Sequence, residues 1–484
     1  MIPTRRGLLA LALGTCLVVA EVGSVVAADP PIVLGSQWEL FVDRFLLDRL
    51  DGVELRLERP RDEGVALPLD LPWEGPFSAY STVLHDGEQF RLYYRGVPTA
   101  GRDGRAAEVT CVAESRDGRT WSKPKLNIYP IGESKETNVI LAGMPPFSHN
   151  FCPFIDQKPG TPPDERFKAV AGLGKSELHA FRSADGLHWT KMHDQPITTG
   201  GAFDSQNVVF WSPVEKQYLG YFRVFVNGIR RISRTTSEDF LHWTKPVLME
   251  YGDGPIEHLY TNQTHPYFRA PHLLIGIAAR FMPGRQVLTA EETTAIGVNP
   301  GYFRDCSDAV LLSTRGGNRY DRTFPEGFIT PGIGPQNSVS RTNYPALNVV
   351  QTGPTEMSLY VNQNYGQPTS HIRRYSLRLD GFSSLVAPYA GGEFVTKPFT
   401  FTGKALSVNF ATSAAGGIRV ELQDADGKPL PGYTLADSVE TIGNEIDCLV
   451  RWQSGTDVSA LAGKPIRLRA VMKDARLYSL QFQP

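Results

Sequence analysis

The chain has 484 residues, with 49 lysines and arginines against 51 aspartates and glutamates and a formal net charge of −2. This balance argues against a polyanion such as nucleic acid as the partner. Aromatic residues make up 10% of the chain, which also contains 46 glycines and 36 prolines. Long periodic helical stretches are absent, so the composition predicts an all-β protein.

The N-terminus has the pattern of a targeting segment. Arg5 and Arg6 precede an apolar run over residues 8–20, and small residues at 26–28 offer a cleavage site. The run is too short to span a membrane comfortably, and no later run is long enough. We therefore expect residues 1–28 to be a twin-arginine-like signal peptide, and the mature protein to be exported, periplasmic or extracellular, without spanning a membrane.

One short pattern recurs along the chain: a serine, a turn-forming segment and, six residues after the serine, a tryptophan. Alternating residues lead into each copy, as expected for a strand that enters a tight turn. Successive copies are roughly 50 to 70 residues apart, about the length of one four-stranded propeller blade. The copies are Ser115–Trp121, Ser183–Trp189 and Ser237–Trp243, with a degraded fourth copy at Ser313–Tyr320.

Each hairpin is interpreted as the outer half of a blade whose inner strands lie just upstream. This interpretation predicts a five-bladed β-propeller over residues 70–385, preceded by a lead-in segment at 29–69. A sixth blade would need a contribution from that lead-in segment. Evenly spaced alternating strands after Ser384 predict a C-terminal β-sandwich at 386–484.

Five blades with Ser-x-Asp-Gly-x-x-Trp-type hairpins, followed by a β-sandwich, resemble the five-bladed propeller glycoside hydrolases. That group includes the invertase-like β-fructosidases, the arabinanases and the arabinofuranosidases. The resemblance implies a carbohydrate substrate and glycoside hydrolysis. The invertase motifs Trp-Met-Asn-Asp-Pro-Asn, Arg-Asp-Pro and Glu-Cys are missing from this sequence, which disfavours a fructosidase. A sialidase-like enzyme and a non-catalytic glycan-binding propeller are the alternatives.

In a propeller, innermost strands begin and second strands end at the same mouth of the central channel, so residues there converge from different blades. Glycoside hydrolysis needs two carboxyl groups, one that protonates the leaving group and one that activates water or attacks carbon. Hydrogen-bond donors follow Asp204, which favours a base or nucleophile. Glu257 stands beside apolar residues, which favours the acid. Glu74 and Asp308 are the further catalytic candidates; a capping turn or a solvated loop charge is the competing interpretation.

Three arginines end the second strands of three blades: Arg95, Arg223 and Arg280. Arginine suits bidentate contact with carboxylate or sulfate, so the hypothesis is an anionic glycan, uronic or sulfated. The alternative is that each arginine pairs with a neighbouring carboxylate. The remaining candidates for substrate binding are His149, Asn150, Gln206, Asn207, His258, Tyr260 and Asp305.

Metal and cofactor signals are missing from the sequence. The four cysteines after Cys16 are widely separated, and no two histidines have the spacing of metal ligands. We therefore predict neither a catalytic metal nor a cofactor. A structural Ca²⁺ in the channel stays open as an alternative.

Overall fold

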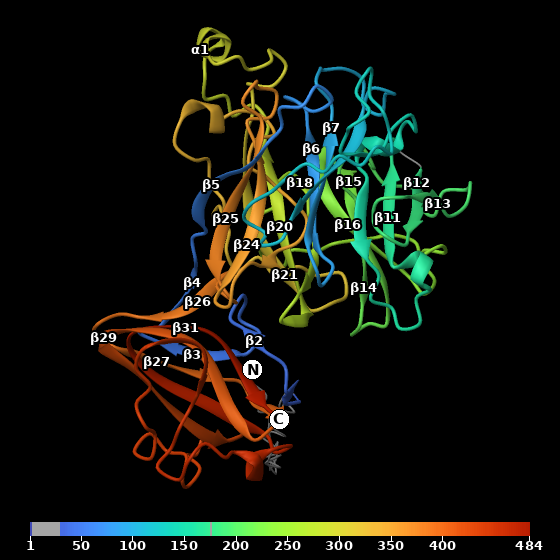
Figure 1. The fold of residues 1–484 in the computed structure, drawn as a ribbon. Coiled ribbons are helices and arrows are strands. Elements are labelled where there is room, and N and C mark those ends of the chain that lie inside the picture. The colour runs from blue at the N-terminus through green and yellow to red at the C-terminus, as the bar shows by residue number, and fades with distance from the viewer. Residues whose placement is uncertain (2–29, 175–176) are drawn as a thin grey trace.

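The computed structural model describes residues 1, 30–174 and 177–484. The expected signal peptide lies outside these residues, apart from Met1. The chain forms a β-propeller and, next to it, a second, C-terminal β-domain (Figure 1). The prediction of an all-β protein with a five-bladed propeller is confirmed. Within the described residues, none of the helices has the length and apolar character needed to cross a membrane.

The first three blades are four-stranded antiparallel sheets of the predicted kind. Blade one consists of β6 (Ala79–His85), β7 (Phe90–Gly96), β8 (Val109–Ser115) and β9 (Val139–Leu141). Blade two consists of β10 (Cys152–Ile155), β11 (Phe167–Gly172), β12 (Leu178–Ser183) and β13 (Thr190–Lys191). Blade three consists of β14 (Val208–Ser212), β15 (Gln217–Val226), β16 (Ile229–Ser237) and β17 (Val247–Leu248).

Blades four and five each have an innermost strand that is interrupted into two short pieces. Blade four consists of β18 (Leu259–Thr261), β19 (His265–Tyr267), β20 (Ala270–Met282) and β21 (Cys306–Thr314). Blade five consists of β22 (Tyr344–Pro345), β23 (Val350–Gln351), β24 (Glu356–Gln363), β25 (His371–Arg378) and β5 (Arg61–Pro68). The short helical turns are η1 (Phe147–His149), η2 (Pro163–Glu165), α1 (Ala290–Ala295), η3 (Pro335–Asn337) and η4 (Ser459–Leu461).

The segment 30–69 is shared between the two domains. Strand β5 pairs antiparallel with β25 and so supplies the outermost strand of blade five. The four strands before it join the C-terminal sheet: β1 (Ile32–Gly35), β2 (Glu39–Leu40), β3 (Leu47–Asp51) and β4 (Glu54–Leu57). The N-terminal segment therefore closes the propeller ring and ties it to the C-terminal domain, a role that the sequence pattern did not indicate.

Ten strands form the C-terminal sheet around one apolar core. The four N-terminal strands are joined by β26 (Ser383–Ala387), β27 (Gly392–Thr396), β28 (Phe399–Phe401), β29 (Ala405–Asp424), β30 (Asn444–Leu449) and β31 (Ile466–Gln483). The long strand β31 is central, because it pairs with β29 along one edge and with β2, β26, β27 and β28 along the other.

The three serine-to-tryptophan hairpins occupy equivalent places in their blades. In each, the serine is the last residue of the third blade strand. In blade two, Ser183 Oγ accepts the Gly186 N–H at 2.9 Å, and Asp185 Oδ1 accepts the Leu187 and His188 N–H groups at 2.8 Å. The other two copies repeat these bonds. Side-chain oxygens within the turn thus accept the hydrogen bonds of its backbone N–H groups. The conformation of the turn can therefore be predicted from the local sequence.

Candidate active site

Seven residues from four blades form a closed series of contacts at the mouth of the channel. They come from starts of innermost strands and ends of second strands, the positions singled out by the sequence. We call this group the mouth ring; its members are Tyr80, Arg95, Asp204, Arg223, Tyr260, Arg341 and Tyr365.

One half of the mouth ring is built on blade one. Arg95, near the end of β7, places its guanidinium carbon 4.8 Å from the centre of the Tyr80 ring. Its Nη2 donates to the Tyr365 hydroxyl at 3.3 Å and to the Phe77 carbonyl at 2.8 Å. The Tyr80 hydroxyl donates to the main-chain oxygen of Asp204 at 3.2 Å. These contacts link blade one to blades five and three.

The other half surrounds Tyr260 of blade four. The guanidinium carbon of Arg223 lies 4.8 Å from the Tyr260 ring centre, and Arg223 also pairs with the Asp204 carboxylate. Arg341, just before β22, lies 5.7 Å from the same ring centre and 5.9 Å from that of Tyr365. This last contact closes the ring of residues. The Asp204 side chain is 39% exposed, so the ring opens to solvent beside a carboxylate.

Most of the positive charge in the mouth ring lacks a carboxylate partner. Among the described residues, neither Arg95 nor Arg341 forms an ion pair, and Asp204 is the single carboxylate paired with Arg223. Arg230 contributes a fourth guanidinium, 5.2 Å from the Tyr260 ring centre and likewise without an ion pair in the described chain. The mouth therefore carries an excess of guanidinium charge around Tyr260, whereas the carboxylates of Glu108 and Asp103 act on Arg95 at longer range.

Two residues of the mouth ring have strained backbones. Tyr80 has φ 55° and Arg341 has φ 58°, in the left-handed region that bulky residues rarely adopt. Each such conformation costs on the order of 1–3 kcal/mol and persists only where the surrounding structure enforces it. Contacts with aromatic rings and guanidinium groups hold both side chains in the mouth.

Tyr260 differs from the other buried tyrosines of this protein. Burial by itself raises the pKa of a phenol, as it does for Tyr80, Tyr344 and Tyr365. At Tyr260 burial also acts upward, but the guanidinium groups of Arg341 and Arg223 outweigh it and hold the pKa below its usual value. The mouth ring thus favours an ionised phenol at this one position.

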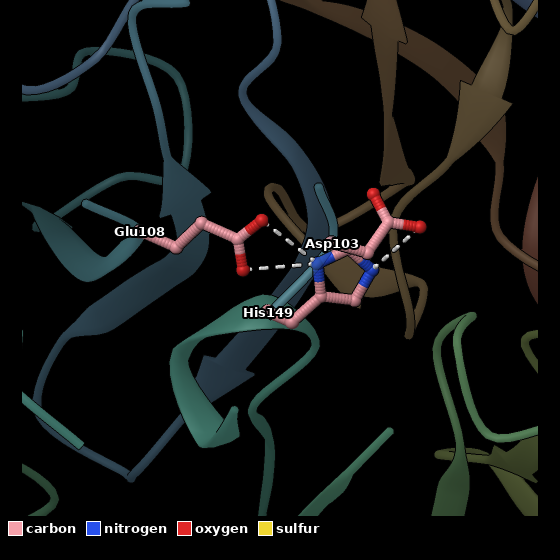
Figure 2. A group of neighbouring side chains, drawn as sticks. All are labelled: Asp103, Glu108 and His149. Carbon is pink, nitrogen blue, oxygen red and sulfur yellow. Dashed lines mark hydrogen bonds and ion pairs between the residues drawn. The ribbon is translucent and has the colours of Figure 1, made fainter. Parts of the chain in front are cut away.

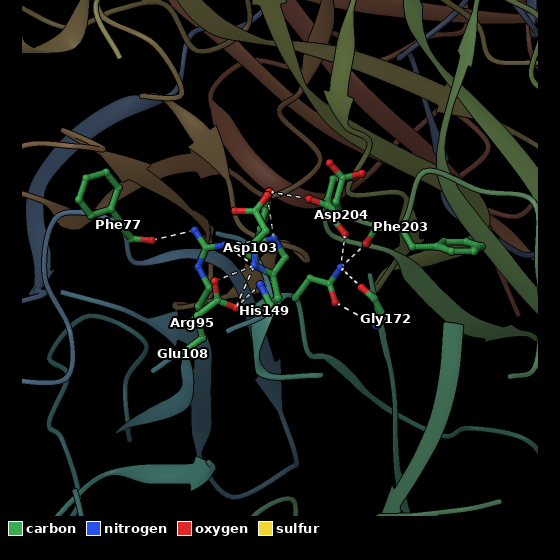
Figure 3. Close-up of polar contacts among 12 residues, drawn as sticks. Phe77, Arg95, Asp103, Glu108, His149, Gly172, Phe203 and Asp204 are labelled. Atoms are coloured by element: carbon green, nitrogen blue, oxygen red, sulfur yellow. Dashed lines mark hydrogen bonds and ion pairs between the residues drawn. The ribbon is translucent and has the colours of Figure 1, made fainter. Parts of the chain in front are cut away.

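His149 packs against Tyr80 of the mouth ring, with 5.5 Å between ring centres, and lies between two carboxylates (Figure 2). Its Nδ1 is 3.0 Å from Glu108 Oε2, and its Nε2 is 3.9 Å from Asp103 Oδ2. These residue types can bind a divalent cation. Arg95 Nη1, however, is 3.1 Å from Nδ1 of the same imidazole (Figure 3). A metal ion here would lie beside a buried guanidinium, so the residues present fit a cation poorly, and the prediction of no catalytic metal stands as a prediction.

Arg280 belongs to a separate group on blade four, where it is paired across β20 and β21 with Asp308. It binds Asp308 through Nε at 2.8 Å and through Nη2 at 2.5 Å, and its Nη1 lies 3.2 Å from Glu257 Oε1. Arg322 Nη2 donates to the other Glu257 oxygen at 2.9 Å. Arg280 therefore matches the alternative interpretation, because neighbouring carboxylates neutralise it. Glu257 lies between two guanidinium groups and not in the apolar setting expected for it.

Glu74 lies apart from the mouth ring. Its side chain is fully buried on blade one, where it accepts from Lys123 Nζ at 2.6 Å and from the Tyr94 hydroxyl at 2.5 Å. Asp305 is also held elsewhere, by the Gly284 N–H and the Ser340 hydroxyl, both at 2.8 Å. The structure brings neither carboxylate to the residues around Tyr260.

The candidate amides are occupied by backbone contacts. Asn150 Nδ2 donates to the carbonyls of Gly172 at 2.7 Å and Ser205 at 2.8 Å, which joins blade two to the segment before blade three. Gln206 Nε2 donates to the Ser81 carbonyl at 3.0 Å, and Asn207 Nδ2 to the Ser205 carbonyl at 2.9 Å. These bonds give the amides a structural role in the channel wall.

Of the residues predicted from their position along the blades, the structure places Arg95, Asp204, Arg223 and Tyr260 in the mouth ring, with His149 in contact with Arg95. His258, also predicted, contacts Arg230 through Nδ1 at 3.3 Å. Two members of the mouth ring, Arg341 and Tyr365, were not predicted from the sequence. Arg341 stands three residues before Tyr344, the first residue of the blade-five innermost strand. The rule applied to the other blades would have found it there.

The long connection between β20 and β21 forms one wall of the mouth. It carries α1, seen at the top of Figure 1. Tyr302 of this connection lies 5.3 Å from Tyr365 and 5.5 Å from Phe77 between ring centres. The Arg341 guanidinium carbon is 4.8 Å from the Tyr302 ring centre. The aromatic lining of the mouth thus extends beyond the blades themselves.

No family model matches the sequence, and no curated protein matches it. Solved structures with a similar fold include a chain described as a glycoside hydrolase, at 10% identity and TM-score 0.45, covering 66% of this chain and 92% of that chain. An N-acetylgalactosamine deacetylase from F. plautii, in complex with blood group B trisaccharide, matches at 12% identity and TM-score 0.45, covering 68% and 96%. An α-L-arabinofuranosidase from Fusarium graminearum matches at 10% identity and TM-score 0.39, covering 66% and 99%.

Proposed function

We propose that the protein is an exported glycoside hydrolase that acts on a poly- or oligosaccharide containing an anionic sugar, uronic or sulfated. The observation that carries the proposal is the charge of the mouth ring. Arg95, Arg223 and Arg341 converge there with Asp204 as the one paired carboxylate among the described residues.

Unpaired guanidinium groups in a partly buried site favour an anionic ligand. They are poorly solvated and retain donors for a carboxylate or sulfate, which a guanidinium binds in a bidentate manner. Nε of Arg95 and of Arg223 is buried and has no hydrogen-bond partner among the described residues. The tyrosine rings beside these groups supply flat apolar surface against which a sugar ring can pack.

The hydrolytic role rests on Asp204 of the mouth ring and on the carboxylates of the separate group around Arg280. Asp204 is the carboxylate of the mouth ring, and we assign it the base or nucleophile role. Glu257 is retained as the candidate proton donor to the leaving group, and its ion pairs with Arg280 and Arg322 would have to open for it to take up that role. Asp308 follows as a further candidate, whereas Glu74 is fully buried apart from the mouth ring.

A glycan-binding propeller without catalysis is the second candidate. The observation that favours it is the composition of the mouth ring, in which Asp204 is the single carboxylate; Glu257 and Asp308 are bound by Arg280 instead. Such a protein would bind the anionic glycan and release it unchanged.

The test is a screen of the purified protein against seven polysaccharides. Polygalacturonate, alginate, chondroitin sulfate and carrageenan are the anionic members, and arabinan, mannan and levan are the neutral ones. We expect new reducing ends from at least one anionic member and from no neutral member. Binding of an anionic member without cleavage would support the second candidate, and cleavage confined to neutral members would overturn the anionic assignment.

A further inference from the structure

We propose that Tyr260 is the catalytic nucleophile and that the reaction passes through a glycosyl–tyrosine intermediate. This inference rests on the proposed hydrolase function and changes the role given to Asp204. It starts from the placement of Tyr260, which is buried in blade four with the guanidinium carbons of Arg223, Arg230 and Arg341 at 4.8, 5.2 and 5.7 Å from its ring centre.

The local charge favours a phenolate at this position. Three guanidinium groups surround the ring, while Asp204 is the one carboxylate among the described residues that pairs with any of them. The surplus of two positive charges can stabilise one phenolate and one anionic group of the substrate together. The lowered pKa of Tyr260 agrees with this arrangement.

Tyr260 also suits the attack better than Asp204 does. The Asp204 carboxylate is already bound by Arg223, and a carboxylate concentrates its charge on two oxygens. A phenolate spreads its charge over the aromatic ring, so a bound uronate or sulfate repels it less. A tyrosine is a known substitute for the carboxylate nucleophile in glycoside hydrolysis. Asp204 then holds Arg223 against the Tyr260 ring and acts as a positioning residue.

The chemical steps balance with groups already named. The phenolate oxygen forms a bond to the anomeric carbon while the bond from that carbon to the leaving oxygen breaks, and the leaving oxygen takes a proton from the acid assigned above. Water then attacks the anomeric carbon and gives its proton to the conjugate base of that acid. The electron pair of the carbon–tyrosine bond returns to the phenolate. Two displacements retain the configuration of the sugar.

Tyr344 provides a matched control. It is a buried tyrosine of blade five whose ring centre is 5.2 Å from that of Tyr260, and its hydroxyl has no hydrogen-bond partner among the described residues. Burial raises the pKa of its phenol. Tyr344→Phe therefore removes a neighbouring hydroxyl of the same kind without removing the proposed nucleophile.

The first experiment needs no substrate: a spectrophotometric titration of the phenols in the parent, Tyr260→Phe and Tyr344→Phe. We expect one phenol to ionise below the usual tyrosine pKa of about 10 in the parent. This step should persist in Tyr344→Phe and vanish in Tyr260→Phe, and in Arg341→Met it should move to higher pH. A low-pH step that survives in Tyr260→Phe would overturn the inference.

The second experiment uses the panel polysaccharide that the parent cleaves. Tyr260→Phe should lose at least about 10³-fold in kcat, as expected for a missing nucleophile, while Tyr344→Phe loses less than about tenfold. The first sugar product of the parent should keep its anomeric configuration by NMR. Inversion, or an unchanged rate in Tyr260→Phe, overturns the nucleophile assignment and leaves the hydrolase function standing. A parent that cleaves no member of the panel overturns both.

Discussion

The guanidinium carbon of Arg341 lies 5.7 Å from the ring centre of Tyr260, and no carboxylate among the described residues pairs with it. Arg341 comes from blade five and Tyr260 from blade four, so the contact depends on closure of the propeller. An arginine held against a phenol and left without a carboxylate partner can bind an anion from outside the protein.

Replacing Arg341 by methionine should weaken the binding of an anionic substrate selectively. Methionine keeps much of the apolar stem and loses the guanidinium group, whose carbon lies 4.8 Å from the Tyr302 ring centre. We expect KM for the anionic polysaccharide to rise about tenfold or more, corresponding to about 1.4 kcal/mol. Kinetics on the cleaved panel member will measure the change.

Arg280→Met serves as the comparison for that variant. Arg280 is neutralised by Asp308 and Glu257, so its removal leaves two carboxylates without their partner. We expect a lower unfolding temperature with a smaller effect on substrate preference. If both variants reduced charged and neutral binding equally, the arginines of the mouth ring would be structural.

Asp204→Asn should preserve the fold and reduce turnover by roughly 10² or more. The amide keeps the shape of the side chain and loses the charge that pairs with Arg223. Circular dichroism will report folding and initial rates will report turnover. Parent-like rates in the variant would show that Asp204 only caps a strand.

How much could be predicted from the sequence depended on the range of the interactions involved. The hairpins could be predicted because the Ser183 hydroxyl accepts hydrogen bonds from the backbone N–H groups of Asp185 and Gly186, which are only two and three residues away. The pairing of β5 with β25 was not readable, because it joins Asp62 to Arg373, more than 300 residues apart. Local chemistry specifies a turn, whereas closure of a propeller depends on which edge strand is left unpaired.

The same distinction applies to the mouth. Position within a blade predicted Arg95, Arg223 and Tyr260 as neighbours, because equivalent strands begin and end at one face. Position alone did not distinguish Arg223, with one carboxylate, from Arg280, which two carboxylates neutralise. That difference depends on side chains that meet across a blade or between blades.

Asp185→Ala should reduce the free energy of unfolding by about 1 kcal/mol at neutral pH through loss of its turn hydrogen bonds. Burial acts to raise the pKa of Asp185, but hydrogen bonds from the His188 backbone and ring outweigh it and lower the pKa. Its contribution is therefore present above the unfolded pKa of about 3.9 and fades as pH falls below it. Urea unfolding at pH 7 and pH 3 will measure the difference.

Asp194→Ala is the control for that experiment, because Asp194 is fully exposed. We expect no measurable change from it at either pH. A cost at Asp185 that did not exceed the cost at Asp194 would mean that the turn forms without its side-chain acceptor.

His265 should make the protein sensitive to mild acid. It is buried between blades four and five, with Nδ1 2.9 Å from the Gln263 carbonyl and Nε2 accepting the Val349 N–H at 3.1 Å. Burial lowers its pKa to about 4. The unfolded histidine binds a proton below about pH 6.5, so stability of about 3 kcal/mol is present above that pH and is lost as pH falls toward 4.

His265→Gln should flatten this part of the stability profile, because glutamine retains an acceptor for Val349 and does not titrate. The free energy of unfolding at pH 4.5, 5.5 and 7 will compare the two proteins. Parallel profiles for parent and variant would assign the acid sensitivity to other groups.

The central claim is that the mouth ring selects an anionic sugar for hydrolysis. The most direct measurement is the ratio of kcat/KM for one oligosaccharide of the cleaved glycan and for its carboxyl-reduced or desulfated counterpart. The account predicts a preference of at least about tenfold for the anionic form in the parent, which falls toward one in Arg341→Met. Equal values for the two oligosaccharides in the parent, or a preference for the neutral one, would contradict it.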